Sequence, residues 1–240
     1  MRQWVVFGFG NYLSDIFDII QSNKGTIKAI VRNIEPTQEQ LGNLKRRITL
    51  LGYEVPITDL GDFHARKNER YCYGFITGRH KLVHSLKRSH NINFSSPIHK
   101  RAYLAANSSH GEGVCIGPHS VIGPNSHIGD FSVINRASSI GHDTVLGEFS
   151  TISPGVAIAG MVKIGRNTFV GIGAAIADGI SIGDDSIVGA GSVVLDDVPQ
   201  GVIVVGAPAR ILRKNERAEW LALNEPRRTL RVRMWRVRCS

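Results

Sequence analysis

The sequence predicts a small α/β domain followed by a parallel β-solenoid, within a chain of 240 residues. Apolar residues recur at every sixth position over residues 116–194, and glycines and small residues keep the same period. The N-terminal part has no such repeat and instead alternates short apolar runs with amphipathic segments. We therefore expect an α/β domain at residues 1–95, a solenoid at 96–213 and a basic tail at 214–240.

The N-terminal part reads as a β-α-β arrangement. The expected strands cover residues 4–7, 26–31 and 71–77, and the expected helices cover residues 12–21 and 80–88. Alternation of strands with helices favours a small parallel sheet of the Rossmann-like type. The segment after the last helix would lead into the solenoid.

A glycine-containing loop, Gly8-Phe9-Gly10-Asn11, joins the first strand to the first helix. Such a loop can place backbone N–H groups near a phosphate, which makes Gly10 and Asn11 candidates for substrate contact. A bare Gly-Phe-Gly is equally typical of a simple turn. Arg32 and Asn33 stand at the end of the second strand, where a dinucleotide site would have an acidic residue, so NAD is not predicted.

The six-residue period is the strongest feature of the sequence. All fourteen of its slots hold Ile, Leu or Val: Ile116, Ile122, Ile128, Ile134, Ile140, Leu146, Ile152, Ile158, Ile164, Val170, Ile176, Ile182, Val188 and Val194. Further upstream Ile98 and Leu104 keep the register, whereas His110 breaks it. A helix is excluded because glycine follows most anchors and costs about 1 kcal/mol in a helix interior. Short strands with tight turns fit, each sending one branched side chain inward while glycine supplies backbone freedom at the turn.

This pattern resembles the hexapeptide-repeat acyltransferases. The resemblance implies triangular coils of three hexapeptides, a left-handed parallel β-helix, and a homotrimer with active sites between neighbouring prisms. The order of the two parts, over residues 3–213, resembles the sialic acid O-acetyltransferase-like and nucleotide-sugar N-acetyltransferase family. That likeness implies an N-terminal domain that holds the nucleotide of a sugar substrate through a glycine turn with a histidine, for which this chain has Asn11 and Tyr12.

Acetyl transfer from a thioester needs a base for the attacking group and donors for the oxyanion. The segment around Asn135 and His142 resembles the stretch with the family's catalytic histidine, which implies that His142 is the base and Asp143 its partner. Asn135 matches a polar residue that lies near the acceptor substrate in this family. Thr151 stands where related enzymes can carry a second active-site histidine, so we include it as a substrate contact. An exposed turn histidine and ordinary turn chemistry are the alternatives.

The resemblance also implies a site for acetyl-CoA. Gly160 lies eighteen residues after His142, and in this family a glycine N–H there meets the thioester carbonyl. The pantetheine arm would contact Gly171, Ile172 and Gly173. The closing segment, residues 204–210, resembles the family's Gly-x-Pro-Ala ending, and the remaining candidates are Ala207 and Pro208 for the adenine and Lys163 and Arg210 for phosphates.

Composition limits the other classes of function. The net charge of +9 is concentrated in residues 221–240, where six arginines against Glu225 give +5 and leave +4 for the rest. We therefore expect no nucleic-acid partner. Three scattered cysteines favour a reducing compartment, and no apolar run is long enough for a membrane span, so we expect a cytoplasmic protein.

We expect an acetyl-CoA-dependent N-acetyltransferase that acts on a nucleotide-activated amino sugar in surface glycan synthesis. O-acetylation of sialic acid or another sugar hydroxyl uses the same base and thioester and stays open. A non-catalytic trimeric solenoid is the alternative of another class. A zinc site of the γ-type carbonic anhydrase needs three converging histidines, and the spacing of His119, His127 and His142 puts them on different edges, so no metal is predicted.

Overall fold

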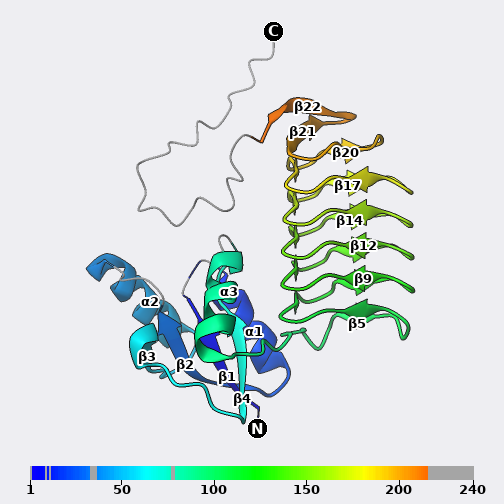
Figure 1. Cartoon of the computed structure of the whole chain (residues 1–240). Coiled ribbons are helices and arrows are strands. Elements are labelled where there is room, and N and C mark those ends of the chain that lie inside the picture. The colour runs from blue at the N-terminus through cyan, green and yellow to red at the C-terminus, as the bar shows by residue number, and fades with distance from the viewer. Residues whose placement is uncertain (1, 9, 11, 33–36, 77–78, 216–240) are drawn as a thin grey trace.

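The computed structural model describes residues 2–8, 10, 12–32, 37–76 and 79–215. An α/β domain lies beside the lower coils of a tall prism built from stacked turns of short strands (Figure 1). Both expected parts are therefore present in the expected order. Among the described residues, no helix has the length and apolar character that a membrane crossing requires.

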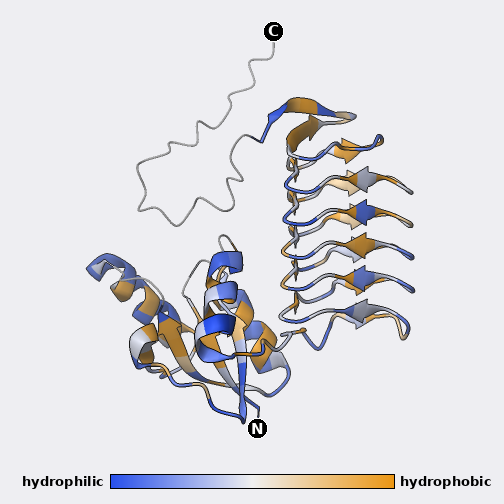
Figure 2. Cartoon of the chain, in the orientation of Figure 1, coloured by the Kyte–Doolittle hydropathy of each residue, from blue (hydrophilic) through white to orange (hydrophobic). Residues whose placement is uncertain are grey.

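The α/β domain has a parallel sheet in the order β3-β2-β1-β4. Its elements are β1 (Gln3–Phe7), α1 (Leu13–Ser22), β2 (Thr26–Arg32), α2 (Gln38–Leu50), β3 (Ile57–Asp59), a 3₁₀ turn (Leu60–Asp62), β4 (Glu69–Tyr73) and α3 (Arg79–His90). The sheet is coloured mainly as hydrophobic in Figure 2, whereas α3 is mainly hydrophilic. The core of the domain lies between the sheet and its helices and includes Phe7, Phe17 and Tyr73.

Two elements of this domain were not expected, and one strand is displaced. Helix α2 begins with a capping box in which Thr37 and Gln40 exchange side-chain-to-backbone hydrogen bonds, a signal that the sequence carries. Strand β3 follows it and forms an edge of the sheet. Strand β4 ends at Tyr73 and does not reach residue 77, because at Gly74 the chain turns so close to Gly8 that a Cβ would lie 2.8 Å from its carbonyl oxygen.

The prism has three sheets, and each coil contributes one short strand to each. Sheet 1 contains β7 (Cys115–Ile116), β10 (Val133–Ile134), β13 (Thr151–Ile152), β16 (Phe169–Val170), β19 (Ile187–Val188) and the closing hairpin β21 (Val202–Gly206) and β22 (Ala209–Lys214). Sheet 2 contains β5 (Tyr103–Leu104), β8 (Val121–Ile122), β11 (Ser139–Ile140), β14 (Ala157–Ile158), β17 (Ala175–Ile176) and β20 (Val193–Val194). Sheet 3 contains β6 (Ser109–His110), β9 (His127–Ile128), β12 (Val145–Leu146), β15 (Lys163–Ile164) and β18 (Ser181–Ile182).

Three columns of turns join these sheets, and they form the edges of the prism. The first edge joins sheet 1 to sheet 2, as at residues 135–138. The second edge joins sheet 2 to sheet 3, as at residues 141–144 and 159–162. The third edge joins sheet 3 to sheet 1, as at residues 147–150.

The fourteen aliphatic slots fill the lumen, as the period predicts, and each is at most 3% exposed. Strands eighteen residues apart pair in parallel, for example Ile140 with Ile158. The irregular slot at His110 still pairs with Ile128, but it lies in the exposed strand β6 near the open start of the prism. A polar side chain is tolerated there because it remains in contact with water.

The repeated glycines do not serve to supply backbone freedom at the turns, as we expected. Glycines that follow the anchors, such as Gly141, are required because the next coil is close: a Cβ at Gly141 would lie 2.3 Å from backbone atoms of Ala159. The left-handed backbone occurs two positions later, at residues such as Asn125 (φ +59°) and Asp143 (φ +55°). In the small-residue column, hydroxyls bond the next coil, as in Ser126 Oγ donating to the Gly141 carbonyl at 2.7 Å.

The two parts of the chain share a packed contact at the third edge. Phe131 and Phe149 stack with ring centroids 5.1 Å apart and belong to the core of the α/β domain. Arg79, at the start of α3, is buried and donates hydrogen bonds to the carbonyl groups of Phe131, Phe149 and Ser150. This contact places the α/β domain against sheet 1 and the third edge.

Candidate active site

His142 and Asp143 form a hydrogen-bonded pair on the second edge. His142 Nδ1 lies 2.7 Å from Asp143 Oδ2, and both side chains are about half exposed. Hydrogen bonds from His142 and then from Asn125 hold the pKa of the Asp143 carboxyl below its usual range. A carboxylate can only accept, so Nδ1 carries the proton and Nε2 is the acceptor of the neutral ring. That nitrogen is the one suited to take a proton from a substrate.

Gly160 lies on the same edge, one coil above His142, as the eighteen-residue spacing predicts. A Cβ at Gly160 would lie 2.5 Å from His142 Nε2 and 2.7 Å from Cε1. Any side chain at this position would therefore displace the ring. The Gly160 backbone therefore lies over the Nε2 end of the His142 ring.

The backbone N–H of Gly160 already has a partner in this structure. It donates to Asp178 Oδ1 at 2.9 Å, and Asp178 is the residue on the next coil of the same edge. The eighteen-residue period extends from His142 through Gly160 to Asp178, although the sequence analysis did not single out Asp178. A thioester oxygen at this N–H has to take the place of the carboxylate.

The predicted acceptor residues do not lie beside His142 within one chain. Asn135 is on the first edge, where its Nδ2 donates to the Ile152 carbonyl at 3.0 Å and its side chain is buried. Thr151 is in β13 of sheet 1 and is also buried. Sheet 2 separates both from the second edge, so within one chain Asn135 and Thr151 do not share a site with His142.

The predicted contacts for the cofactor are spread in the same way. Gly171, Ile172 and Gly173 form a turn of the first edge, and the Ile172 side chain is 57% exposed. Ala207 and Pro208 join β21 to β22, next to Arg210, which pairs with Asp196 at 3.2 Å. Lys163 lies on sheet 3, beyond the second edge. Within a single chain, Gly160 on the second edge is therefore apart from the turn at residues 171–173 on the first edge.

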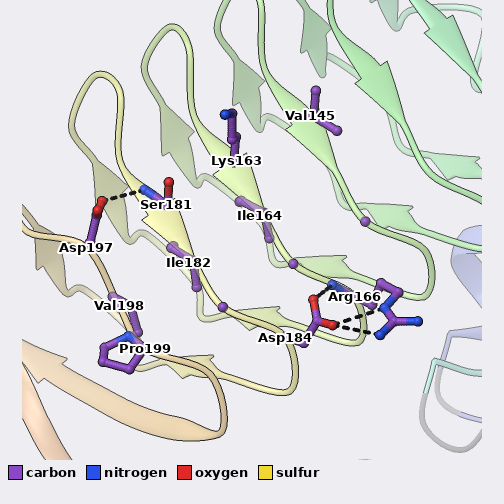
Figure 3. Close-up of a pocket in the computed structure, with 13 residues that line it drawn as sticks. Val145, Lys163, Ile164, Arg166, Ser181, Ile182, Asp184, Asp197, Val198 and Pro199 are labelled. Atoms are coloured by element: carbon purple, nitrogen blue, oxygen red, sulfur yellow. Dashed lines mark hydrogen bonds and ion pairs between the residues drawn. The ribbon is translucent and has the colours of Figure 1, made fainter.

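An open groove of about 630 Å³ runs along sheet 3. Figure 3 shows Val145, Lys163 and Ser181 on successive strands, with the Arg166–Asp184 ion pair on one side and Asp197 on the other. Lys163 is the only predicted site residue among those that line it. This groove does not include His142 or Gly160.

The glycine loop of the α/β domain lies at the carboxyl end of β1. Gly10 packs so closely against Phe75 that a Cβ would be 2.6 Å from its Cβ, and the Gly10 carbonyl accepts a hydrogen bond from Arg47 at 3.4 Å. Asn11, the other predicted loop residue, lies outside the described residues. Arg47 comes from α2, the helix that the sequence analysis missed. Helix α1, which follows the loop, is near the first edge, because its Asp15 pairs with Arg136 there at 3.4 Å.

The three histidines weighed as zinc ligands lie in different places. His119 is in a turn of the first edge, His127 is on β9 of sheet 3, and His142 is on the second edge. Among the described residues, no cluster of three His, Cys, Asp or Glu side chains is arranged to hold a metal ion.

Comparisons with known proteins give the following similarities. A family model described as bacterial transferase hexapeptide (six repeats) matches residues 161–196. A solved structure of a perosamine N-acetyltransferase variant from Caulobacter crescentus, in complex with CoA and GDP-perosamine, is 28% identical, with a TM-score of 0.73 over 88% of this chain and 97% of that chain. A search of curated protein sequences finds no match.

Two further structures show the same fold. The acetyltransferase domain of PglB from Neisseria gonorrhoeae, in complex with acetyl coenzyme A, is 23% identical, with a TM-score of 0.74 over 88% of this chain and 99% of that chain. WeeI from Acinetobacter baumannii is 24% identical, with a TM-score of 0.73 over 88% of this chain and 100% of that chain. The expected likeness to hexapeptide-repeat sugar acetyltransferases is confirmed, and so is the left-handed parallel β-helix.

Proposed function

We propose that this chain is a hexapeptide-repeat acyltransferase that transfers the acetyl group of acetyl-CoA to an amine of a nucleotide-activated amino sugar. The observation that carries the proposal is the His142–Asp143 pair with the Gly160 backbone directly over the ring. The likeness to an N-acetyltransferase in complex with CoA and GDP-perosamine supports this choice of donor and acceptor. A purely structural solenoid has no need of this arrangement.

In the proposed reaction the sugar amine attacks the thioester carbonyl carbon, and His142 Nε2 takes a proton from the nitrogen. Asp143 stabilises the imidazolium that forms. The Gly160 N–H donates to the oxyanion of the tetrahedral intermediate. When the carbon–sulfur bond breaks, the electron pair leaves with sulfur, and His142 returns its proton to give free CoA and the N-acetylated sugar.

The acceptor would be held in part by the α/β domain. Helix α1 lies near the first edge, which also carries Asn135, and Arg47 adds a cation beside Gly10. A nucleoside diphosphate is the kind of group that a loop at a helix N-terminus and a nearby arginine can hold.

We propose residues 1–95 as the nucleotide-sugar domain and residues 96–213 as the acetyltransferase domain. We propose the cytoplasm as the location.

Asp178 gives a test of the role assigned to Gly160. If the Gly160 N–H receives the thioester oxygen, the carboxylate competes with acetyl-CoA for that donor. The change Asp178→Ala should lower the KM for acetyl-CoA by about 3- to 10-fold, the range of one net hydrogen bond. Steady-state kinetics with varied acetyl-CoA measures it.

Asp130 supplies the matched control, because its Oδ1 accepts from the Glu112 N–H at 2.9 Å in the same geometry on the third edge. Asp130→Ala should leave the KM unchanged. Equal KM values for Asp178→Ala and the parent enzyme would mean that another group binds the thioester oxygen.

We further propose a homotrimer in which the second edge of one copy faces the first edge of the next. This would bring His142 and Gly160 to Asn135 and the turn at residues 171–173, which one chain keeps apart. Ile172 is exposed in the single chain and is therefore available for such a contact. CoA would then lie between two copies.

Mixed assemblies test this arrangement. Neither His142→Ala nor Ile172→Asp alone should support turnover, but co-expressed chains should regain activity, because some sites combine an intact His142 with an intact Ile172. The activity of purified mixed oligomers, with a solution mass of three chains, is the measurement. Full activity of a monomer would contradict the proposal.

Release of free CoA tests the function itself. Acetyl-CoA would be incubated with UDP-, GDP- and dTDP-linked 3-amino and 4-amino sugars and with free sialic acid, with His142→Ala as the blank. Turnover is expected with at least one nucleotide-linked amino sugar. Turnover with sialic acid alone would assign O-acetylation, and no turnover with any acceptor would contradict the proposal.

A further inference from the structure

Below His142 the second edge carries a row of amide side chains that ends at the Asp143 carboxylate. Asn107 Nδ2 donates to Asn125 Oδ1, and Asn125 Nδ2 donates to Asp143 Oδ1 at 3.0 Å. The other carboxylate oxygen, Asp143 Oδ2, is the one bonded to His142. Two asparagines and an aspartate therefore lead, coil by coil, to the candidate base.

The row follows from the geometry of the coil. Asn107, Asn125 and Asp143 are spaced by eighteen residues, so they stack on one edge. Asn125 and Asp143 both have a left-handed backbone, which asparagine and aspartate adopt more readily than most side chains. This backbone aims each side chain at the corresponding position of the next coil.

Each bond in the row fixes the orientation of the next. Because Asn125 Oδ1 accepts from Asn107, the Nδ2 of Asn125 faces Asp143. Because that Nδ2 occupies Asp143 Oδ1, the second oxygen is directed to His142 Nδ1. An exposed aspartate without this constraint would sample several rotamers and would orient the imidazole less often.

We propose that Asn125 is a positioning residue for the His142–Asp143 pair, with Asn107 fixing the direction of its amide. Asn125 acts through Asp143 and does not itself contact the reacting atoms. The proposal rests on the proposed function, because it assumes that His142 is the base.

The chain contains a matched control for this row. On the third edge Asn167 also has a left-handed backbone, and its Nδ2 donates to Asp185 Oδ1 at 2.7 Å. The geometry is that of Asn125 and Asp143, but the residue before Asp185 is Asp184 and not a histidine. Substitutions at Asn167 therefore report the structural value of such a bond alone.

The first test replaces each asparagine by glycine, which keeps the left-handed backbone and removes the amide. Asn125→Gly should lower kcat by roughly 10-fold, within the 10- to 100-fold range for residues that orient a ligating or catalytic group. The KM for acetyl-CoA should not change. Asn167→Gly should leave kcat unchanged. The two glycine variants should lower the thermal midpoint by similar amounts, because each loses one such hydrogen bond. Equal kcat values for the two glycine variants would overturn the proposal.

The second test uses charge. Asn125→Asp puts a carboxylate next to Asp143, and the added negative charge favours the protonated ring, whereas a base must be neutral to act. The ascending limb of kcat/KM against pH should move up by roughly half a pH unit, the size expected for one added unit charge near the ring in a high-dielectric environment. Asn167→Asp should not move it. An unmoved limb in Asn125→Asp would contradict the placement of Asn125 beside the base, while the comparison of the two glycine variants tests the positioning role itself.

The other charged groups on or beside this edge are common to all these variants. Asp178 holds the Gly160 amide, and Lys163 begins the adjoining strand β15.

The two proposals fail in different ways. Full activity of His142→Ala would contradict the proposed function, whereas an inactive His142→Ala together with Asn125 variants that behave like the Asn167 variants would contradict only the positioning role.

Discussion

Replacing His142 by alanine is expected to lower kcat by about 10² to 10⁴-fold, the usual contribution of a general base. The reason is that Nε2 of the ring, with Nδ1 held by Asp143, is the acceptor that faces Gly160. Binding of acetyl-CoA should persist, because the backbone of the second edge does not depend on this side chain. Steady-state kinetics gives kcat, and a thermal shift with saturating acetyl-CoA reports binding.

His127→Ala is the matched control for this loss. His127 is exposed on sheet 3, and its Nδ1 lies 2.9 Å from Ser109 Oγ. Its removal should leave kcat unchanged. A kcat for His142→Ala within about 2-fold of the parent would remove the histidine from the mechanism, since a general base contributes far more than that.

The second large effect is expected on stability, at Arg79. This residue is 5% exposed, and its guanidinium donates to Phe131 O at 2.8 Å, to Ser150 O at 2.9 Å and to the carbonyl groups of Phe149 and Ile76. Arg79→Met keeps a long side chain but removes these charge-assisted hydrogen bonds, although the Phe131 and Ser150 carbonyl groups each keep one other donor, the Tyr73 hydroxyl and the Val133 N–H. We expect a loss of about 3 to 5 kcal/mol in the free energy of unfolding of the α/β domain.

Urea unfolding followed by helical circular dichroism measures this loss, because α1, α2 and α3 belong to the α/β domain. Arg136→Met is the control. Its guanidinium is 58% exposed in a pair with Asp15, and exposed pairs are worth about 0 to 1 kcal/mol. Equal midpoints for the two methionine variants would show that the Arg79 contacts do not hold the domain to the prism.

The lumen and the stacking of edges could be predicted because they depend on one local rule. Each anchor, such as Ile140, needs only to point inward, and the period then determines which residues lie eighteen positions apart on one edge. The same frame contains the row of Asn107 and Asn125 below Asp143. It was missed because spacing alone does not say which turn residue has the left-handed backbone.

The attachment of the α/β domain could not be predicted in this way. The spacing of Arg79 from Leu82, Val83 and Leu86 puts it on the buried face of α3. Its acceptors, however, are carbonyl groups more than fifty residues away in sequence, and the spacing does not identify them. Carbonyl acceptors leave no trace in the sequence, since every residue has one. Helix α2 is different, because the Thr37 and Gln40 capping box was visible and would have revealed both α2 and Arg47.

The most direct test of the account is a crystal structure of the protein with CoA bound. The account predicts the CoA sulfur beside the Gly160 backbone and His142 Nε2, with a turn at residues 171–173 from a second copy along the pantetheine arm. CoA bound in the groove of sheet 3, with its sulfur away from His142, would contradict it.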